Sequence, residues 1–284
     1  MNIKKTPEEF IVKEEAQLEL GSGKYAYFLL EKKNWNTLDI IRDIARRLNI
    51  KEKDIGFSGN KDKRAWTFQH ISIPVSKERV LGLRIRDVRL EYLGNGSKRI
   101  NLGMLKGNHF EIVVRDCKGI EEKEFIINYF GEQRFGVEKK NWKVGKYLIL
   151  GKFKDACELL NLEVERNDYL GALKREGFRT LKFYIASYQS YLWNKVVDGK
   201  GKVPILGYLT EGKVYDKLMK EEGIKKTDFM IMSFRELSAE GGEREGVVEI
   251  QDFKSEKIED GVYRVSFFLS KGAYATEVLR QIVL

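Results

Sequence analysis

The chain has 284 residues, of which 42% are hydrophobic, and 52 Lys and Arg against 43 Asp and Glu give it a net charge of +9. This composition predicts a folded chain with a sizeable core, and it excludes a collagenous or largely disordered one. No apolar run reaches the ~20 residues of a membrane helix, and the N-terminus lacks an apolar signal core. Two cysteines and two histidines are too few for a disulfide framework or a His/Cys metal site. We therefore expect a cytoplasmic protein with no membrane contact.

Hydrophobic periodicity predicts the following elements in chain order. Residues 9–30 form two strands, and residues 37–49 form a helix with Thr37 as its N-cap. The remaining predictions are strands at 54–57, 64–73, 84–93 and 109–115, helices at 121–130, 152–161, 165–176 and 182–198, strands at 246–252 and 262–269, and a last helix at 274–283. Two strand-bearing ends thus flank a mostly helical middle, which indicates the α+β class.

The excess positive charge is concentrated in one stretch. Residues 51–120 hold 15 basic and 8 acidic side chains, whereas residues 121–284 hold 28 and 27. Such a concentration is typical of a protein that binds a polyanion, nucleic acid in particular. The alternative is a solvated basic face without a partner.

The common cofactor motifs are missing. Gly21-Ser22-Gly23-Lys24 hints at a phosphate loop, but neither the full P-loop pattern nor a dinucleotide-binding G-x-G-x-x-G is present. A G-x-S-x-G elbow and a C-x-x-C pair are also absent. These absences favour a reaction without a cofactor, or no reaction at all.

One acidic residue lies inside the basic stretch. Asp62 is flanked by Lys61, Lys63 and Arg64, and neighbouring cations favour the ionised form of a carboxylate. An ionised carboxylate close to a phosphate backbone suits catalysis on a nucleic acid. The alternative is an aspartate in a polar loop that satisfies turn hydrogen bonds.

The sequence around Asp62, GFSGNKDKRAWTFQ, resembles the signature of the TruD family of tRNA pseudouridine synthases. Further blocks resemble the family in the same order: KKTPEEFIV at 4–12, GMLKGNHFEIV at 103–113, NYFGEQRFG at 128–136, SYQSYLWN at 187–194, and FLSKGAYAT at 268–276 with Arg280. The chain is short for the family, and Ser270 stands where the family usually has proline.

The resemblance implies an enzyme that isomerises uridine to pseudouridine in tRNA, at position 13 in the D-arm. It implies no cofactor and no metal, because no atoms are added in this reaction. It also implies a mixed, mainly antiparallel sheet in a discontinuous catalytic core of residues 1–139 and 244–284. A mostly helical, TRUD-type domain is inserted at 140–243, and core and insertion would form a basic cleft. Binding of tRNA there should weaken as salt rises.

The resemblance also assigns roles to residues. Asp62 is the catalytic carboxylate, acting as a nucleophile or as a base, and Arg280 is its partner. Phe130 stacks on the target uracil, which must leave the base stack, and Asn128 hydrogen-bonds near the base or the carboxylate. Lys4 and Lys61 contact the active site or a phosphate.

Four of the supporting residues also have a plainer interpretation. Arg280 could be a cation at a helix C-terminus, and Phe130 a core residue ahead of a capping glycine. Lys4 and Lys61 could be solvated surface residues. The tyrosines at 184, 188 and 191 follow helical spacing and are assigned to a core rather than to the site.

Two other functions compete with the synthase. The first is a non-catalytic, basic RNA-binding module on the same fold, which would have no use for a carboxylate among cations. The second is a different cofactor-free RNA enzyme such as a nuclease, but His70 and His109 lack the carboxylate or histidine company that this chemistry usually needs.

Overall fold

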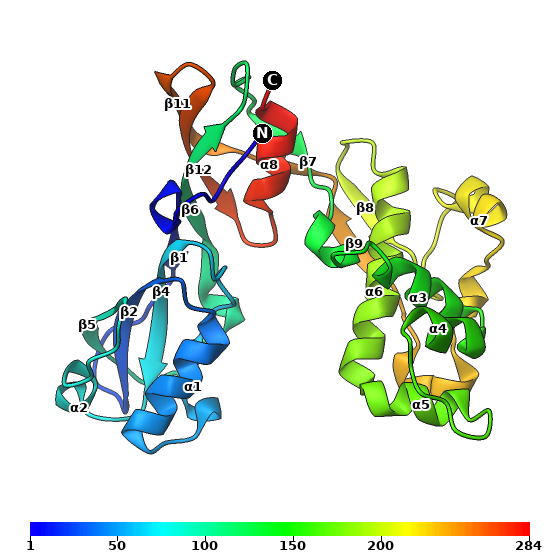
Figure 1. Ribbon diagram of the computed structural model, residues 1–284, viewed down its shortest axis with the longest axis horizontal. Coiled ribbons are helices and arrows are strands. Elements are labelled where there is room, and N and C mark those ends of the chain that lie inside the picture. Colours follow the sequence, from blue (N-terminus) through cyan, green and yellow to red (C-terminus); the bar gives the residue numbers. More distant parts are fainter. The chain divides into compact units, whose positions relative to one another are not determined.

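The computed structural model describes residues 1–284 and divides into two units (Figure 1). The first unit comprises Met1–Phe125 and Glu249–Leu284, and the second comprises Ile126–Val248. The boundaries predicted from the sequence are residues 140 and 243. The difference arises because Ile127 and Phe130 pack with Trp193 of the second unit, so the segment after Phe125 already belongs to it.

The first unit is built on an eight-stranded sheet with the order β11-β12-β6-β1-β4-β2-β5, in which β3 also pairs with β4. Its strands are β1 (Phe10–Ala16), β2 (Tyr25–Lys33), β3 (Gly56–Phe57), β4 (Trp66–Ile73), β5 (Val88–Gly96), β6 (Leu105–Arg115), β11 (Gln251–Glu259) and β12 (Val262–Ser270). The β1–β4 pair is parallel, and the other recorded pairs are antiparallel. This confirms the predicted α+β class with a mainly antiparallel sheet.

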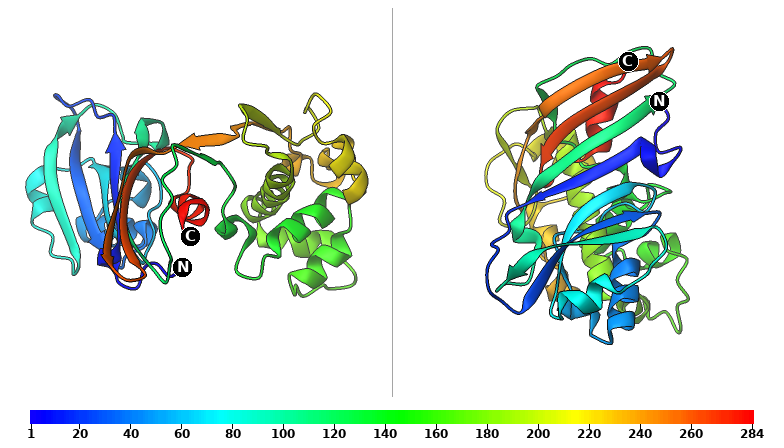
Figure 2. Two further views of the ribbon diagram at one scale, coloured as in Figure 1. Left: turned by 90° about the horizontal axis from the view of Figure 1, so that it is seen from above. Right: turned by 90° about the vertical axis from the view of Figure 1, so that its left-hand side faces the viewer.

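Three helices accompany this sheet: α1 (Thr37–Leu48), α2 (Lys77–Leu81) and α8 (Ala275–Ile282). Helix α1 lies against the face of β2 and β4, and α8 lies beside β6 and β12 (Figures 1 and 2). The predicted apolar stripe of α1, with Ile40 and Ile44, is buried against Phe28 and Ile71. Burying such a stripe removes apolar surface from water and fixes the helix on the sheet.

The start of α1 differs from the prediction. The N-cap is Asn36, whose side-chain oxygen accepts a hydrogen bond from the N–H of Leu38 at 3.1 Å. Thr37 is the first helical residue and is completely buried. The prediction was wrong because the Thr37 hydroxyl is engaged in tertiary hydrogen bonds, and either residue type can cap a helix.

The second unit has five α-helices and short strands. These elements are α3 (Asn141–Ile149), α4 (Phe153–Leu159), α5 (Tyr169–Glu176), α6 (Phe178–Val196), α7 (Asp216–Glu222), β7 (Phe125–Ile127), β8 (Lys202–Ile205), β9 (Gly242–Glu245) and β10 (Val247–Glu249), of which β7 and β10 lie at the boundary. Tyr188 of α6 is fully buried in the core of this unit, and Tyr191 stacks on Trp142 at 4.1 Å between ring centroids. The assignment of these tyrosines to a core is confirmed. No helix in the chain combines enough length and apolar character to cross a bilayer.

The helix predicted at 121–130 does not form. Residues Phe125–Ile127 are instead strand β7, which pairs with β10 more than 100 residues later in the chain. Local spacing suggested a helix because apolar residues cluster there, and only the distant partner strand favours the extended conformation.

Candidate active site

Asp62 lies in the loop at residues 58–65, between β3 and β4. Its carboxylate forms an ion pair with the ammonium of Lys4, and the Asp62 side chain remains 42% exposed. The Lys4 ammonium also lies 4.0 Å from the centroid of the Phe10 ring, which is buried. Lys4 is therefore held between an aromatic face and the carboxylate, and one side of Asp62 stays open to a substrate.

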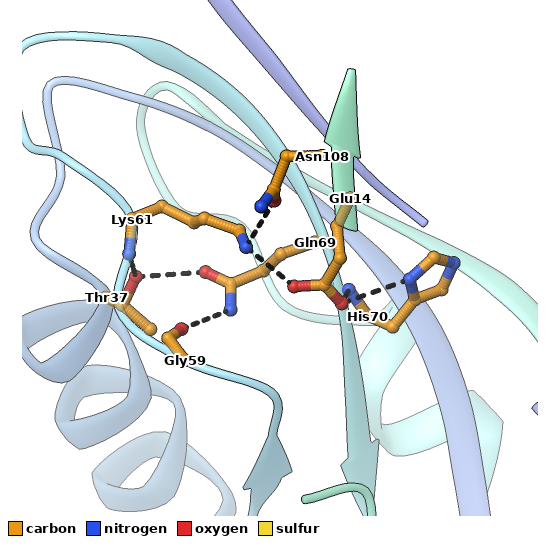
Figure 3. A network of polar contacts seen from close by, with 7 residues as sticks. All are labelled: Glu14, Thr37, Gly59, Lys61, Gln69, His70 and Asn108. Atoms are coloured by element: carbon orange, nitrogen blue, oxygen red, sulfur yellow. Dashed lines mark hydrogen bonds and ion pairs between the residues drawn. The ribbon is translucent and has the colours of Figure 1, made fainter. Parts of the chain in front are cut away.

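The backbone of this loop is anchored to α1 and β4 (Figure 3). The N–H of Lys61 donates to the hydroxyl of Thr37 at 2.9 Å, and that hydroxyl donates to the Gln69 side chain at 2.9 Å. The Gln69 amide in turn donates to the carbonyl of Gly59 at 3.1 Å. Buried hydrogen bonds on both sides of Asn60 hold the loop in one conformation, so Asp62 is positioned before any substrate arrives.

The side chain of Lys61 points toward Glu14 and Asn108 (Figure 3). Its ammonium lies 2.9 Å from Oε2 of Glu14 and donates to Oδ1 of Asn108 at 2.7 Å. The side chain of Lys61 is 7% exposed and that of Glu14 is 0% exposed. Lys61 and Glu14 thus form a buried ion pair beneath the loop, and the lysine that contacts the Asp62 carboxylate is Lys4.

Glu14 is held in its charged form by its neighbours. Burial alone would raise the pKa of Glu14. Hydrogen bonding from His70 and the charge of Lys61 outweigh burial, so the pKa of Glu14 falls from 4.5 to about 2. The backbone N–H of His70 and its Nδ1 lie 3.1 and 3.2 Å from Oε1 of Glu14. The carboxylate therefore stays ionised across the physiological range. Nε2 of His109 lies 3.1 Å from Oε2 of Glu15, so the expectation that neither histidine has a carboxylate neighbour was wrong.

A second buried lysine supports the same loop. The ammonium of Lys32 donates to the carbonyl of Trp35 at 2.7 Å and to the carbonyl of Asp62 at 3.3 Å, and the residue is fully buried. Burial lowers the pKa of Lys32 to about 8, although the charge of Asp62 opposes this change. A buried ammonium next to the Asp62 backbone is costly for folding, which indicates a role in the site.

Replacing Lys32 by Met is expected to lower kcat by about 10- to 100-fold, because the Asp62 backbone loses an anchor and small misplacements are costly in catalysis. The free energy of unfolding at pH 7 should fall by no more than about 1 kcal/mol, because a desolvated charge is removed together with its hydrogen bonds. Single-turnover kinetics and urea unfolding measure both quantities. Lys33→Met is the matched control, since Lys33 is partly exposed and pairs with Glu8 at 2.8 Å; equal kinetic losses in both variants would contradict this role.

Arg280 lies in α8 of the first unit. Its guanidinium is 3.3 Å from Oε1 of Glu277, which is buried on the same helix. The Arg280 side chain is 39% exposed. Its predicted role as the partner of Asp62 stays a prediction.

Asn128 and Phe130 form a separate cluster in the second unit. The Phe130 ring meets Trp193 edge-on at 5.4 Å, and the guanidinium carbon of Arg244 lies 4.1 Å from the Phe130 centroid. Arg244 also donates to Oδ1 of Asn128 at 2.6 Å, and the backbone of Phe130 exchanges two hydrogen bonds with the Asn194 side chain. Phe130 is partly rather than fully buried, so it is not a plain core residue. Its contact with a base stays a prediction.

Several supporting residues were not predicted from the sequence, among them Glu14, Lys32 and Arg244. For Glu14 and Lys32, the sequence holds a signal in the alternation of inward-facing and outward-facing residues along a strand. Glu14 continues the inward-facing positions of Phe10 and Val12 in β1, and Lys32 continues those of Phe28 and Leu30 in β2. A charge at an inward position requires a buried partner or a function.

Comparisons with known proteins give a consistent result. The family model described as tRNA pseudouridine synthase D (TruD) matches residues 1–163 and 201–282. The chain is similar to a protein designated tRNA pseudouridine synthase D in Aquifex aeolicus, with 35% identity over 250 residues that cover 69% of this chain and 65% of the other. It is also 31% identical to a protein designated tRNA pseudouridine synthase D 1 in Methanocaldococcus jannaschii, over 99% of this chain and 95% of the other.

A solved structure agrees with these sequence matches. The crystal structure of a protein designated tRNA pseudouridine synthase D in Methanosarcina mazei superposes with a TM-score of 0.80 at 25% identity. The superposition covers 98% of this chain and 92% of the other. The superposed residues therefore include both units of the fold.

Proposed function

The chain belongs to the TruD family of tRNA pseudouridine synthases, isomerases of uridine in tRNA, and on this premise we propose that Asp62 is the carboxylate through which it acts. The observation that carries the proposal is the geometry of the loop at 58–65. The Asp62 side chain is 42% exposed, and its carboxylate pairs with Lys4. Hydrogen bonds from the Lys61 N–H to Thr37 and from Lys32 to the Asp62 carbonyl hold the backbone of the loop in place. A loop with no function would not need a buried ammonium beneath it.

The reaction explains why a carboxylate is sufficient. The bond between N1 of uracil and C1′ of ribose breaks, a bond between C5 and C1′ forms, N1 gains a proton, and C5 loses one. The composition of the nucleoside is unchanged, so no oxidant, reductant or cofactor takes part. Asp62 acts as a nucleophile toward the nucleoside or as a base that removes a proton during the rearrangement, and both roles require an ionised, accessible oxygen. Lys4 forms an ion pair with this carboxylate.

The remaining predicted residues complete the proposal. Arg280 pairs with the Asp62 carboxylate during the reaction, and Phe130 stacks on the extruded uracil, a contact that contributes about 1–3 kcal/mol per base. Asn128 hydrogen-bonds near the base, and Arg244 keeps Asn128 and Phe130 together. Lys61 contributes indirectly, through its ion pair with Glu14. The target is uridine 13 in the D-arm of tRNA. The two free, buried cysteines suit the reducing cytoplasm, where tRNA is found.

The proposed function is tested with unmodified tRNA that carries tritium at C5 of uracil. The protein is expected to release one tritium per target uridine, because C5 loses its proton when the new bond forms. Mapping pseudouridine by carbodiimide modification and primer extension should place it at position 13, and a tRNA with cytidine at this position should release nothing. Binding of tRNA without any release would instead favour the non-catalytic RNA-binding module.

A further inference from the structure

A row of exposed basic side chains follows one end of the sheet in the first unit. We call it the arginine edge, and it consists of Arg84, Arg86 and Arg89 together with Lys63 and Arg64, all of them exposed. Lys63 and Arg64 belong to the loop that carries Asp62, and the three arginines lie in or next to the segment that leads into β5. This surface has no assigned role in the reaction described above.

The two segments of the arginine edge lie at the same end of the sheet, because both flank the end of β2. In the sheet, Lys33 lies opposite Trp66 of β4, and Lys32 lies opposite Val88 of β5. The N–H of Lys33 donates to the carbonyl of Asp87 at 3.0 Å, and Nε1 of Trp35 donates to the carbonyl of Arg86 at 3.0 Å. Since neighbouring strands are about 4.8 Å apart, the loop at 58–65 and the segment at 84–87 lie about two strand spacings from each other.

The charges of the arginine edge are largely uncompensated within the protein. Arg84 donates only to the carbonyls of Leu81 and Leu83, at 3.0 and 3.2 Å. Arg86 lies 3.5 Å from a carboxylate oxygen of Asp87, its sequence neighbour, while 93% of its side chain is exposed. Arg89 has no ion pair, although Glu31 lies opposite it in the sheet, because Glu31 accepts from Nε1 of Trp66 at 2.9 Å.

Most other arginines of the first unit behave differently, although Arg79 and Arg99 also donate to backbone carbonyls rather than to carboxylates. Arg42, Arg46, Arg47, Arg115, Arg264 and Arg280 each lie beside a carboxylate. Grouping unpaired like charges on one surface raises the electrostatic free energy of the folded state, which a bound polyanion would lower. The positive charge of the arginine edge therefore favours binding of an anionic partner.

The shape of this surface suits a nucleic-acid backbone. Arg84, Arg86 and Arg89 line a groove of about 430 Å³ whose other walls include the aliphatic side chains of Leu83 and Leu90. Guanidinium groups bind phosphate oxygens through paired hydrogen bonds, and aliphatic walls can pack against ribose. A groove with this combination matches a sugar–phosphate strand better than an isolated small anion.

We propose that the arginine edge binds the phosphate backbone of tRNA next to the target uridine and so holds the substrate in register with Asp62. This inference rests on the proposed function, because Asp62 defines where the uridine lies. The backbone of Arg86 is connected to the Asp62 loop through Trp35, because Lys32 donates to the carbonyls of both Trp35 and Asp62. The arginine edge and the Asp62 carboxylate therefore lie at the same end of the sheet. The contacts carry no sequence information and act on affinity and register.

The test compares two triple variants that remove the same charge. Arg84→Gln/Arg86→Gln/Arg89→Gln removes three cations of the arginine edge, and Arg42→Gln/Lys98→Gln/Lys257→Gln removes three that are paired with carboxylates elsewhere in the first unit. Affinity for unmodified tRNA is measured by fluorescence anisotropy between 50 and 300 mM NaCl. Loss of three phosphate contacts should reduce the slope of log K against log salt by about 2 to 3. The KM for tRNA should rise at least about tenfold, and the control variant should change neither quantity by more than about twofold.

Each outcome separates this inference from the proposed function. Tritium release by the wild-type protein with unchanged tRNA binding by the arginine-edge variant would overturn the inference and leave the function intact. If tRNA binding weakened equally in both triple variants, the loss would reflect the change in net charge alone, and this result would also overturn the inference. Absence of tritium release from the wild type would refute the proposed function, whatever the salt slopes show. Circular dichroism spectra of both variants are the control for folding.

Discussion

Replacing Asp62 by Asn should abolish pseudouridine formation. We expect a loss of at least about 10³-fold in the rate at saturating tRNA, because an amide is neither a nucleophile nor a base of useful strength. The substitution preserves size and leaves the loop anchors at Thr37 and Lys32 in place. Single-turnover tritium release from tRNA labelled at C5 measures the rate.

Binding distinguishes a catalytic loss from a structural one. The Asp62→Asn variant should bind tRNA as tightly as the wild type or slightly more tightly, since a negative charge next to the phosphate backbone is removed. Asp116→Asn is the matched control, because Asp116 is exposed in the same unit and its positive φ of 57° is tolerated by Asn. A retained rate in Asp62→Asn, or an equal loss in the control, would remove Asp62 from its role.

The second large effect concerns the buried ion pair of Glu14 and Lys61. Replacing Lys61 by Met should lower the free energy of unfolding at pH 7 by about 3–5 kcal/mol, because Glu14 would stay buried without its cation. The double variant Glu14→Gln/Lys61→Met should recover part of this loss, since neither buried charge then remains. Urea unfolding of the single and double variants measures the coupling energy. Activity of the single variant should fall as well, because Lys61 is next to Asp62 in the chain.

The pH dependence of stability provides an independent check on Glu14. Its pKa is 4.5 in the unfolded chain and about 2 in the folded one, so the stabilisation is complete above pH 4.5 and is lost as the pH falls toward 2. At about 1.4 kcal/mol per pKa unit, this contribution is about 3 kcal/mol. Glu14→Gln should remove it, so that unfolding free energies of wild type and variant converge between pH 4.5 and pH 2.

Glu15→Gln is the control for this titration. Glu15 is the next residue of β1, faces the opposite side of the sheet, and is 42% exposed beside His109 and Lys106. Water screens an exposed ion pair of this kind, so it contributes little to stability. If Glu15→Gln changed the acid dependence as much as Glu14→Gln, the buried pair would not be its source.

Much of this protein could be predicted from local patterns. Alternating residues predicted β1, β2, β4 and β12, and helical spacing predicted the buried face of α1. These patterns are informative because an element that buries one face repeats its apolar residues with the period of its own backbone. The motif around Asp62 likewise indicated the proposed site, since the residues of one loop are consecutive in sequence.

The support beneath Asp62 depended on the tertiary structure. Lys4 and Asp62 are 58 residues apart, Lys61 and Asn108 are 47 apart, and Glu14 and His70 are 56 apart. No local period relates such residues; strand pairing brings them together, as when β6 places Asn108 opposite Glu14. The same reason explains why Phe125–Ile127 is a strand and why the unit boundary falls at residue 126. The residues of one loop can be recognised in the sequence because they are consecutive. The buried charged residues that hold the loop cannot be recognised in this way, because only strand pairing in the folded sheet brings them next to their partners.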